Sequence, residues 1–137
     1  MNELIIVAED EESFSTLLQY NLEHEGYRVA NAADGEAAWR AIVLQRPDLV
    51  VVECRLPRLS GFELCRRMRL ERALRATPVL LVSARGDGFV HGLAALVGAD
   101  DCLAAPFPML DFARRVRALL QPVEADLAQS WRIPGGC

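Results

Sequence analysis

The sequence lacks several features that mark common classes of protein. No apolar run approaches the roughly 18 residues that a helix needs to cross a bilayer. Acidic residues occupy the N-terminal dozen, where a secretory signal peptide carries basic ones. None of the four cysteines forms a CxxC pair, which gives a metal site or a redox pair weak support. These absences predict a cytoplasmic protein with no membrane association.

Basic residues are also outnumbered, and the formal net charge is -4. A domain that binds nucleic acid usually presents a basic face, so we expect no direct nucleic-acid binding by this chain. The charge does not exclude a separate DNA-binding domain in a partner or in the same protein.

Length and composition indicate one compact domain. The chain has 137 residues, of which 52% are hydrophobic and 25% charged. The periodic pattern decays after Gln121, so we expect one domain over residues 1–121 and a tail over 122–137. Val123, Leu127 and Trp131 keep a four-residue step, so part of this tail could instead be a short helical extension.

Short apolar runs alternate with helical patterns along the first 121 residues. Such runs are typical of strands buried on both faces, and we expect strands at 4–8, 27–30, 49–52, 79–82 and 101–104. Asp34 is a candidate helix N-cap, and Ser60 with Glu63 has the spacing of a capping box. Five βα units predict an α/β fold: a doubly wound, five-stranded parallel sheet with five helices.

Ligand chemistry in parallel sheets gathers at the carboxyl ends of the strands. Glu9, Asp10, Glu53, Ser83 and Ala105 lie at such positions. If the strands that end near Glu9 and Glu53 are neighbours, three carboxylates converge, and Mg²⁺ prefers such oxygen ligands. The alternative is a set of solvated acids on the rim of the loops, since acids are common beside helix N-termini.

Four segments carry a resemblance to a known family, and they occur in its order and spacing: IIVAEDEE, PDLVVVECRLPRLSGFEL, TPVLLVSARG and GADDCLAAPF. They resemble the signature segments of CheY-like receiver domains from bacterial response regulators, most closely those of the OmpR/PhoB class. The match covers roughly residues 3 to 120. It implies a CheY-like (flavodoxin-like) sheet with strand order 2-1-3-4-5 and a role in two-component signalling.

The resemblance also assigns roles to residues of the predicted pocket. The pair that binds Mg²⁺ falls on Glu9 and Asp10, and the phosphorylated aspartate falls on Glu53. The hydroxyl that contacts the phosphoryl group falls on Ser83. The remaining family positions are a lysine before a cis proline and an aromatic switch residue, which correspond here to Ala105 before Pro106 and to Cys102.

Three of these positions depart from the family pattern. Glu53 extends its carboxylate by one methylene, roughly 1.5 Å, and a misplacement near 1 Å can reduce a rate about 100-fold. Ala105 removes a cation that would stabilise the transferred phosphoryl group. Cys102 has no ring that could move inward. Together they predict a non-enzymatic receiver that is not phosphorylated in the usual way, binds Mg²⁺ weakly at most, and acts through protein–protein contacts.

Several alternatives remain open from the residues. Glu53 could mimic a phosphorylated aspartate, with Arg55 replacing the lysine, or the Arg55 guanidinium could point to solvent. The chain could be a working receiver, or the N-terminal receiver of an OmpR/PhoB-type DNA-binding regulator. Expected partners are a sensor histidine kinase or a downstream regulator.

A homodimer is also predicted, through the face that the fourth helix, fifth strand and fifth helix form in OmpR/PhoB receivers. Charged positions of that face match Asp101, Asp111, Arg115 and Arg117. The fourth helix carries apolar residues where that class carries charges: Phe89, Val90, Leu93, Leu96 and Val97. An apolar stripe beyond core needs marks an interface. The alternative is that most of these residues face the core.

Overall fold

The computed structural model describes residues 2–84 and 90–121. The predicted tail over 122–137 and Phe89 lie outside these residues. Five parallel strands form one sheet in the order β2-β1-β3-β4-β5, as predicted. Their bounds are Leu4–Ala8 (β1), Arg28–Ala32 (β2), Leu49–Glu53 (β3), Val79–Ser83 (β4) and Asp101–Ala104 (β5).

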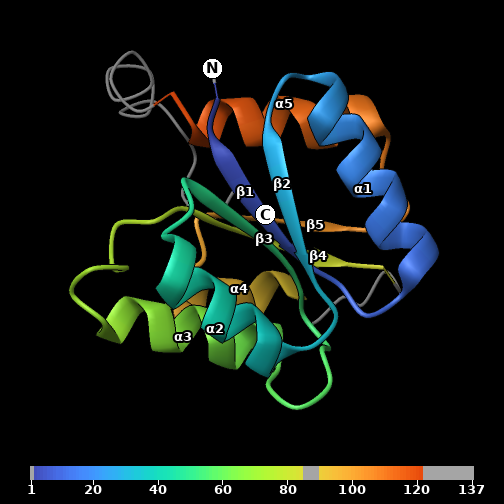
Figure 1. Ribbon diagram of the computed structural model, residues 1–137. Coiled ribbons are helices and arrows are strands. Elements are labelled where there is room, and N and C mark those ends of the chain that lie inside the picture. Colours follow the sequence, from blue (N-terminus) through green and yellow to red (C-terminus); the bar gives the residue numbers. More distant parts are fainter. Residues whose placement is uncertain (1, 85–89, 122–137) are drawn as a thin grey trace.

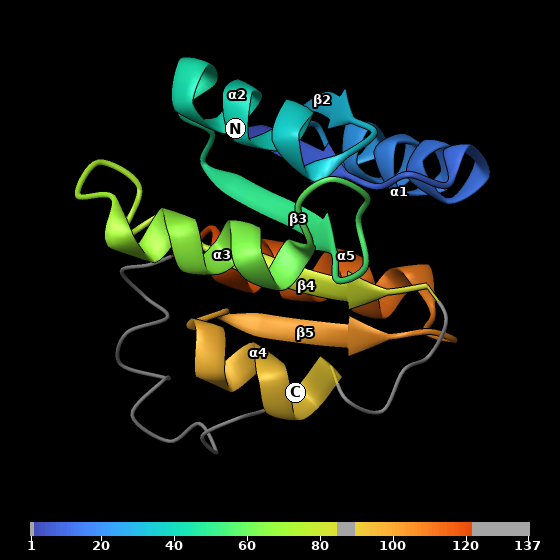
Figure 2. The ribbon, with the colours of Figure 1, turned by 90° about the horizontal axis from the view of Figure 1, so that it is seen from below.

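Five helices connect and cover the strands, so the predicted doubly wound α/β fold is confirmed (Figure 1). Helices α1 and α5 cover one face of the sheet, and α2, α3 and α4 cover the other (Figures 1 and 2). Their bounds are Glu12–His24 (α1), Gly35–Gln45 (α2), Gly61–Leu70 (α3), Val90–Val97 (α4) and Met109–Leu119 (α5). Among the described residues, no helix is long and apolar enough to span a membrane.

Local sequence signals explain where the elements begin and end. The Asp34 carboxylate accepts a hydrogen bond from the Ala37 amide at 2.8 Å, which satisfies a free donor at the start of α2. The Ser60 hydroxyl accepts from the Glu63 amide at 3.1 Å and caps α3 in the same way. Strand β2 differs from expectation, because it extends to Ala32, two residues beyond the predicted end.

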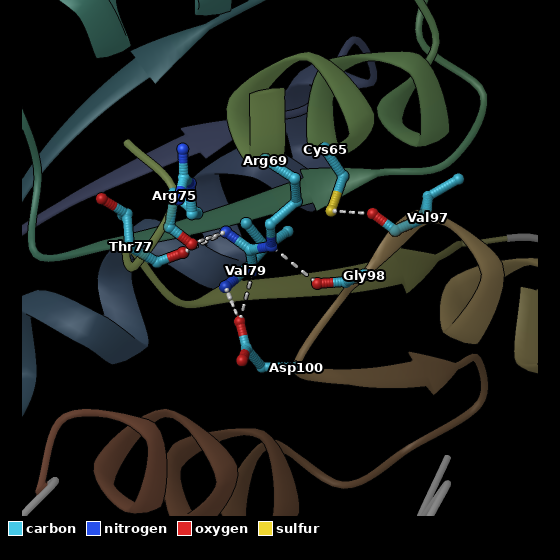
Figure 3. A network of polar contacts seen from close by, with 8 residues as sticks. All are labelled: Cys65, Arg69, Arg75, Thr77, Val79, Val97, Gly98 and Asp100. Carbon is cyan, nitrogen blue, oxygen red and sulfur yellow. Dashed lines mark hydrogen bonds and ion pairs between the residues drawn. The ribbon is translucent and has the colours of Figure 1, made fainter. Parts of the chain in front are cut away.

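The edge of the sheet at the start of β4 is tied together by one arginine of α3 (Figure 3). The Arg69 guanidinium donates to the backbone oxygens of Gly98 (2.8 Å), Thr77 (2.8 Å) and Arg75 (3.1 Å). It also pairs with Asp100 at 2.7 Å, and Asp100 accepts from the Val79 amide at 2.8 Å. These contacts join the end of α3, the loop before β4 and the turn between α4 and β5.

Candidate functional site

The strand order brings the predicted pocket residues to one edge of the sheet. Strand β1 pairs with β3, and β3 pairs with β4, with Glu53 opposite Val82. Glu9 therefore lies beside the end of β3, and Ser83 beside it on the other side. All three polar side chains are buried, with exposed fractions of 4% for Glu9, 4% for Glu53 and 1% for Ser83. Burial this deep excludes solvated rim acids for Glu9 and Glu53, whereas Asp10 is exposed.

The Glu53 carboxylate is held by backbone amides from two loops. One oxygen accepts from Ala84, just after β4, at 2.8 Å, and the other accepts from Arg55 at 3.2 Å. The start of α3 approaches the Glu53 backbone so closely that only glycine fits at position 61. A Cβ atom at Gly61 would lie only 2.2 Å from the Glu53 carbonyl oxygen. Glu53 thus joins the β3–α3 loop to the end of β4.

Glu9 is the electrostatically unusual group of the pocket. One of its oxygens accepts from the Glu11 amide at 2.9 Å, while Oε1 is buried without a hydrogen-bond partner. The pKa of Glu9 is raised to about 8, mainly by burial; the hydrogen bond from Glu11 lowers it, and the charges of Glu53 and Asp10 add smaller increases that are included in this value. A carboxyl with this pKa is largely protonated at neutral pH.

These residues meet the requirements of a magnesium site only in part. The unpartnered Oε1 of Glu9 is a vacant oxygen ligand, and Asp10 follows it in the chain. However, residues 2–84 and 90–121 contain no group of three or more His, Cys, Asp or Glu residues arranged to hold a metal ion. The three carboxylates lie close together, as expected from neighbouring strands, but they are therefore not arranged as three metal ligands, and both Glu53 oxygens accept from backbone amides. Glu9 and Asp10 are the residues that would hold Mg²⁺, a hard Lewis acid that neutralises charge on oxygen.

The remaining positions singled out in the sequence lie in or directly after β4 and β5. The Ala105 amide donates to the Ser83 carbonyl oxygen at 2.8 Å, and the Ala105–Pro106 peptide bond is cis. Cys102 is buried in β5, with an exposed fraction of 1%. The sequence contains no lysine at all, so no lysine from another position replaces the one missing at Ala105.

The residues predicted for a dimer face separate into two groups. Arg115 pairs with Asp101 at 2.9 Å and with Asp111 at 3.6 Å, so these three charges lie together within one chain. Arg117 pairs instead with Glu25, beyond the end of α1, at 2.5 Å. Leu93 and Leu96 of α4 are exposed, at 41% and 81%. Phe89 and the Val90 side chain lie outside what the structure describes.

Sequence reasoning missed two features of this molecule. The unpartnered oxygen of Glu9 had no signal in the spacing, because it depends on which oxygens the backbone amides satisfy. The Arg69–Asp100 pair was also missed, since Arg69 is one of seven arginines between residues 55 and 75. Its signal is the position of Asp100 one residue before β5, beside the start of β4.

Comparison with known proteins identifies the family. The model of the response regulator receiver domain matches residues 5–117. The chain is 41% identical over 124 residues to the alkaline phosphatase synthesis transcriptional regulatory protein PhoP of Bacillus subtilis, covering 90% of this chain and 51% of that protein. It is 39% identical over 125 residues to the phosphate regulon transcriptional regulatory protein PhoB of Rhizobium meliloti, with coverages of 90% and 54%. The chain thus spans about half the length of these curated relatives.

A solved structure supports the same assignment. The receiver domain of the sensor histidine kinase PA1611 from Pseudomonas aeruginosa PAO1 superposes with a TM-score of 0.80 at 29% identity, covering 88% of this chain and 98% of that one. That structure holds a magnesium ion coordinated in its active-site cleft. Sequence, strand order and pocket position agree, and the chain belongs to the response regulator receiver domain family.

Proposed function

We propose that this receiver domain is an interaction module of two-component signalling that is not phosphorylated at its acceptor position. The observation that carries the proposal is the pair of backbone hydrogen bonds to Glu53, from Ala84 and Arg55. A phosphoryl group attached at the end of β3 would need amide donors at that place to stabilise its oxygens. The Glu53 carboxylate already occupies both donors.

The charge around the acceptor supports the same proposal. Phosphoryl transfer depends mainly on positioning and on neutralisation of charge. Ala105 provides no cation that could neutralise charge at the acceptor. Magnesium binding is weak in this proposal, since Glu53 would have to release a backbone amide to join Glu9 and Asp10 as a ligand.

Intact-mass spectrometry after incubation with acetyl phosphate and Mg²⁺ tests this proposal. We expect no gain of a phosphoryl group, and the Glu53→Gln variant is the matched control. A gain of one phosphoryl group by the wild type that disappears in Glu53→Gln would overturn the proposal. Isothermal titration with MgCl₂ should give no dissociation constant in the low micromolar range, which would imply full octahedral coordination.

The surface through which this module acts is proposed to be the α4–β5–α5 face, used in a homodimer. Leu93 and Leu96 expose apolar side chains there, while Asp101, Asp111 and Arg115 pair within their own chain. Intrachain pairs leave fewer charges for the contact between chains. The dimer should therefore be more apolar and less sensitive to salt than a contact made of ion pairs.

Sedimentation at tens of micromolar protein tests the dimer. We expect Leu96→Glu to shift the protein to monomer, because a charge placed in an apolar contact is desolvated without a partner. Leu44→Glu on α2 is the matched control, since Leu44 is 82% exposed and Leu96 is 81% exposed. A wild-type monomer, or a dimer that dissociates in moderate salt, would contradict this proposal.

A second candidate function rests on the coverage of the relatives. Since PhoP and PhoB are transcriptional regulators of about twice the matched length, this chain could be the receiver of a longer DNA-binding regulator. In that arrangement an attached output domain would be the downstream partner, and a sensor histidine kinase the upstream one. The reading frame that encodes the chain distinguishes this candidate from a free-standing module.

A further inference from the structure

Charge is distributed unevenly along the chain, and the excess of positive charge lies around one helix. Residues 55–75, which include α3 and its flanking loops, contain seven arginines and two acidic residues. The whole chain has 15 basic and 19 acidic residues, so the remainder is strongly acidic. A local basic region on an acidic protein attracts the acidic surface of a partner.

Apolar side chains are exposed beside this basic region. Leu70 near the end of α3 is 73% exposed, and Leu44 and Val43 near the end of α2 are 82% and 48% exposed. Single exposed leucines are common on soluble proteins and need no explanation. Here three such side chains lie near the C-terminal ends of two adjacent helices.

Contacts between α2 and α3 show that these residues share one surface. The Arg67 guanidinium of α3 lies 5.2 Å from the centre of the Trp39 ring of α2 and pairs with Glu36 at 3.8 Å. Helices α2 and α3 lie side by side on the same face of the sheet (Figures 1 and 2). One turn beyond the Trp39–Arg67 contact, α2 presents Val43 and α3 presents Leu70, because residues three or four apart lie on the same side of a helix.

The α2–α3 surface is defined here as Trp39, Val43, Leu44, Arg66, Arg67 and Leu70. We propose that it is a docking site for an amphipathic helix of another protein, with leucine-like residues on one side and acidic residues along its edges. The exposed apolar side chains match the apolar side of such a helix, and the exposed Arg72 and Arg75 match its acids. Arg66 and Arg67 pair with Glu63 and Glu36 at 3.4 and 3.8 Å, through surface contacts weak enough for an acidic partner to replace. This mode of recognition places one helix in a groove between others.

The chemistry of the surface favours a protein over the other classes of partner. Nucleic acid would engage the arginines but would leave Val43, Leu44 and Leu70 without an apolar contact, since its backbone is charged. The surface is also separate from the α4–β5–α5 face. Leu96→Glu therefore serves as a control for docking, and Leu44→Glu as a control for dimerisation.

An NMR titration of the ¹⁵N-labelled protein tests the docking site. The probe is a synthetic helical peptide of about 16 residues with leucines at i, i+3, i+4 and i+7 and glutamates elsewhere. We expect amide shifts confined to α2 and α3, with a dissociation constant below about 0.5 mM, as suits a small interface. Leu44→Glu combined with Leu70→Glu should weaken binding at least about tenfold, and Leu96→Glu should leave it unchanged.

Four outcomes would overturn the proposal. The first is the absence of shifts at about 1 mM peptide, well above the expected dissociation constant. The second is equal binding of a peptide with the same composition and scattered leucines, which would show attraction by charge alone. The third is tighter binding of a single-stranded oligonucleotide to the same residues. The fourth is a loss of self-association in Leu44→Glu but not in Leu96→Glu, which would assign the surface to a second copy.

Discussion

The two ends of strand β4 are held by the same kind of hydrogen bond in opposite electrostatic surroundings. At the start, the Asp100 carboxylate accepts from the Val79 amide at 2.8 Å, and at the end, the Glu53 carboxylate accepts from the Ala84 amide at 2.8 Å. Asp100 also pairs with Arg69, whereas Glu53 lies near Glu9 and has Ala105 where the family has lysine. At the start of β4, Arg69 neutralises the charge of the Asp100 carboxylate. At the end of β4, the two acidic residues Glu53 and Glu9 lie together.

This difference should give the two ends different effects on stability. A carboxylate that shares a guanidinium with three backbone oxygens contributes to the folded state, and it ties three segments together (Figure 3). A carboxylate beside another buried acid destabilises the folded state unless a proton or a cation is bound.

The largest expected effect comes from restoring the family residues at the acidic end. Glu53→Asp shortens the acceptor, and Ala105→Lys supplies the cation, so the double variant should gain phosphorylation from acetyl phosphate and Mg²⁺. We expect at least about 100-fold over either single variant, because both groups act on the same transferring phosphoryl group. Intact mass against time measures the rates. Phosphorylation of Glu53→Asp alone at the rate of the double variant would show that the missing lysine is tolerated.

The next effect concerns the neutralised end. Arg69→Met removes the guanidinium that faces Asp100 and donates to three backbone oxygens, so we expect a loss of about 3 kcal/mol in the free energy of unfolding. Urea denaturation measures the change. Arg66→Met is the matched control on the same helix, because Arg66 has a 63% exposed side chain and pairs with Glu63 only at the surface. We expect that control to change stability by less than about 0.5 kcal/mol; equal losses would refute the role assigned to Arg69.

A pH effect should appear at the acidic end alone. The folded-state pKa of Glu9, about 8, lies above its value of 4.5 in an unfolded chain. The folded state therefore binds more protons between these values, and stability present below pH 4.5 is lost as the pH rises through 8. Thermal melts in EDTA should show a loss of order 2 kcal/mol between pH 5.5 and 8. Glu9→Gln should remove that loss, and an unchanged pH profile in this variant would show that another group titrates.

The sequence was sufficient for the fold because periodicity and caps report on local backbone structure. Strand β5 has the predicted bounds, and the caps at Asp34 and Ser60 form as expected. Strand β2 was placed too early, because the predicted run ends at Ala30 and the exposed Asn31 interrupts the apolar pattern that Ala32 completes. The order and spacing of the four signature segments were sufficient to identify the receiver-domain family.

The site was predicted in position but not in its hydrogen bonding. The sequence placed Glu9, Glu53 and Ser83 at one edge, and the structure buries all three. It could not show that both Glu53 oxygens accept from backbone amides, because that depends on the conformation of two loops and on the close approach of Gly61. For the same reason, it could not show that the three acids, within the described part of the chain, are not arranged as three metal ligands.

The smallest expected effect comes from replacing a carboxylate by an amide at each end of β4 in turn. Asp100→Asn removes the charge that faces Arg69 and should reduce the free energy of unfolding by about 2 kcal/mol. In Glu53→Gln the amide oxygen can still accept from Ala84, while the amide nitrogen can no longer accept from Arg55. That loss is offset because one charge leaves the neighbourhood of the buried Glu9. The net change should stay within about 1 kcal/mol. Urea denaturation at pH 7 compares the two variants directly. If Glu53→Gln costs as much as Asp100→Asn, a cation neutralises Glu53 in solution, and the contrast between the two ends of β4 is wrong.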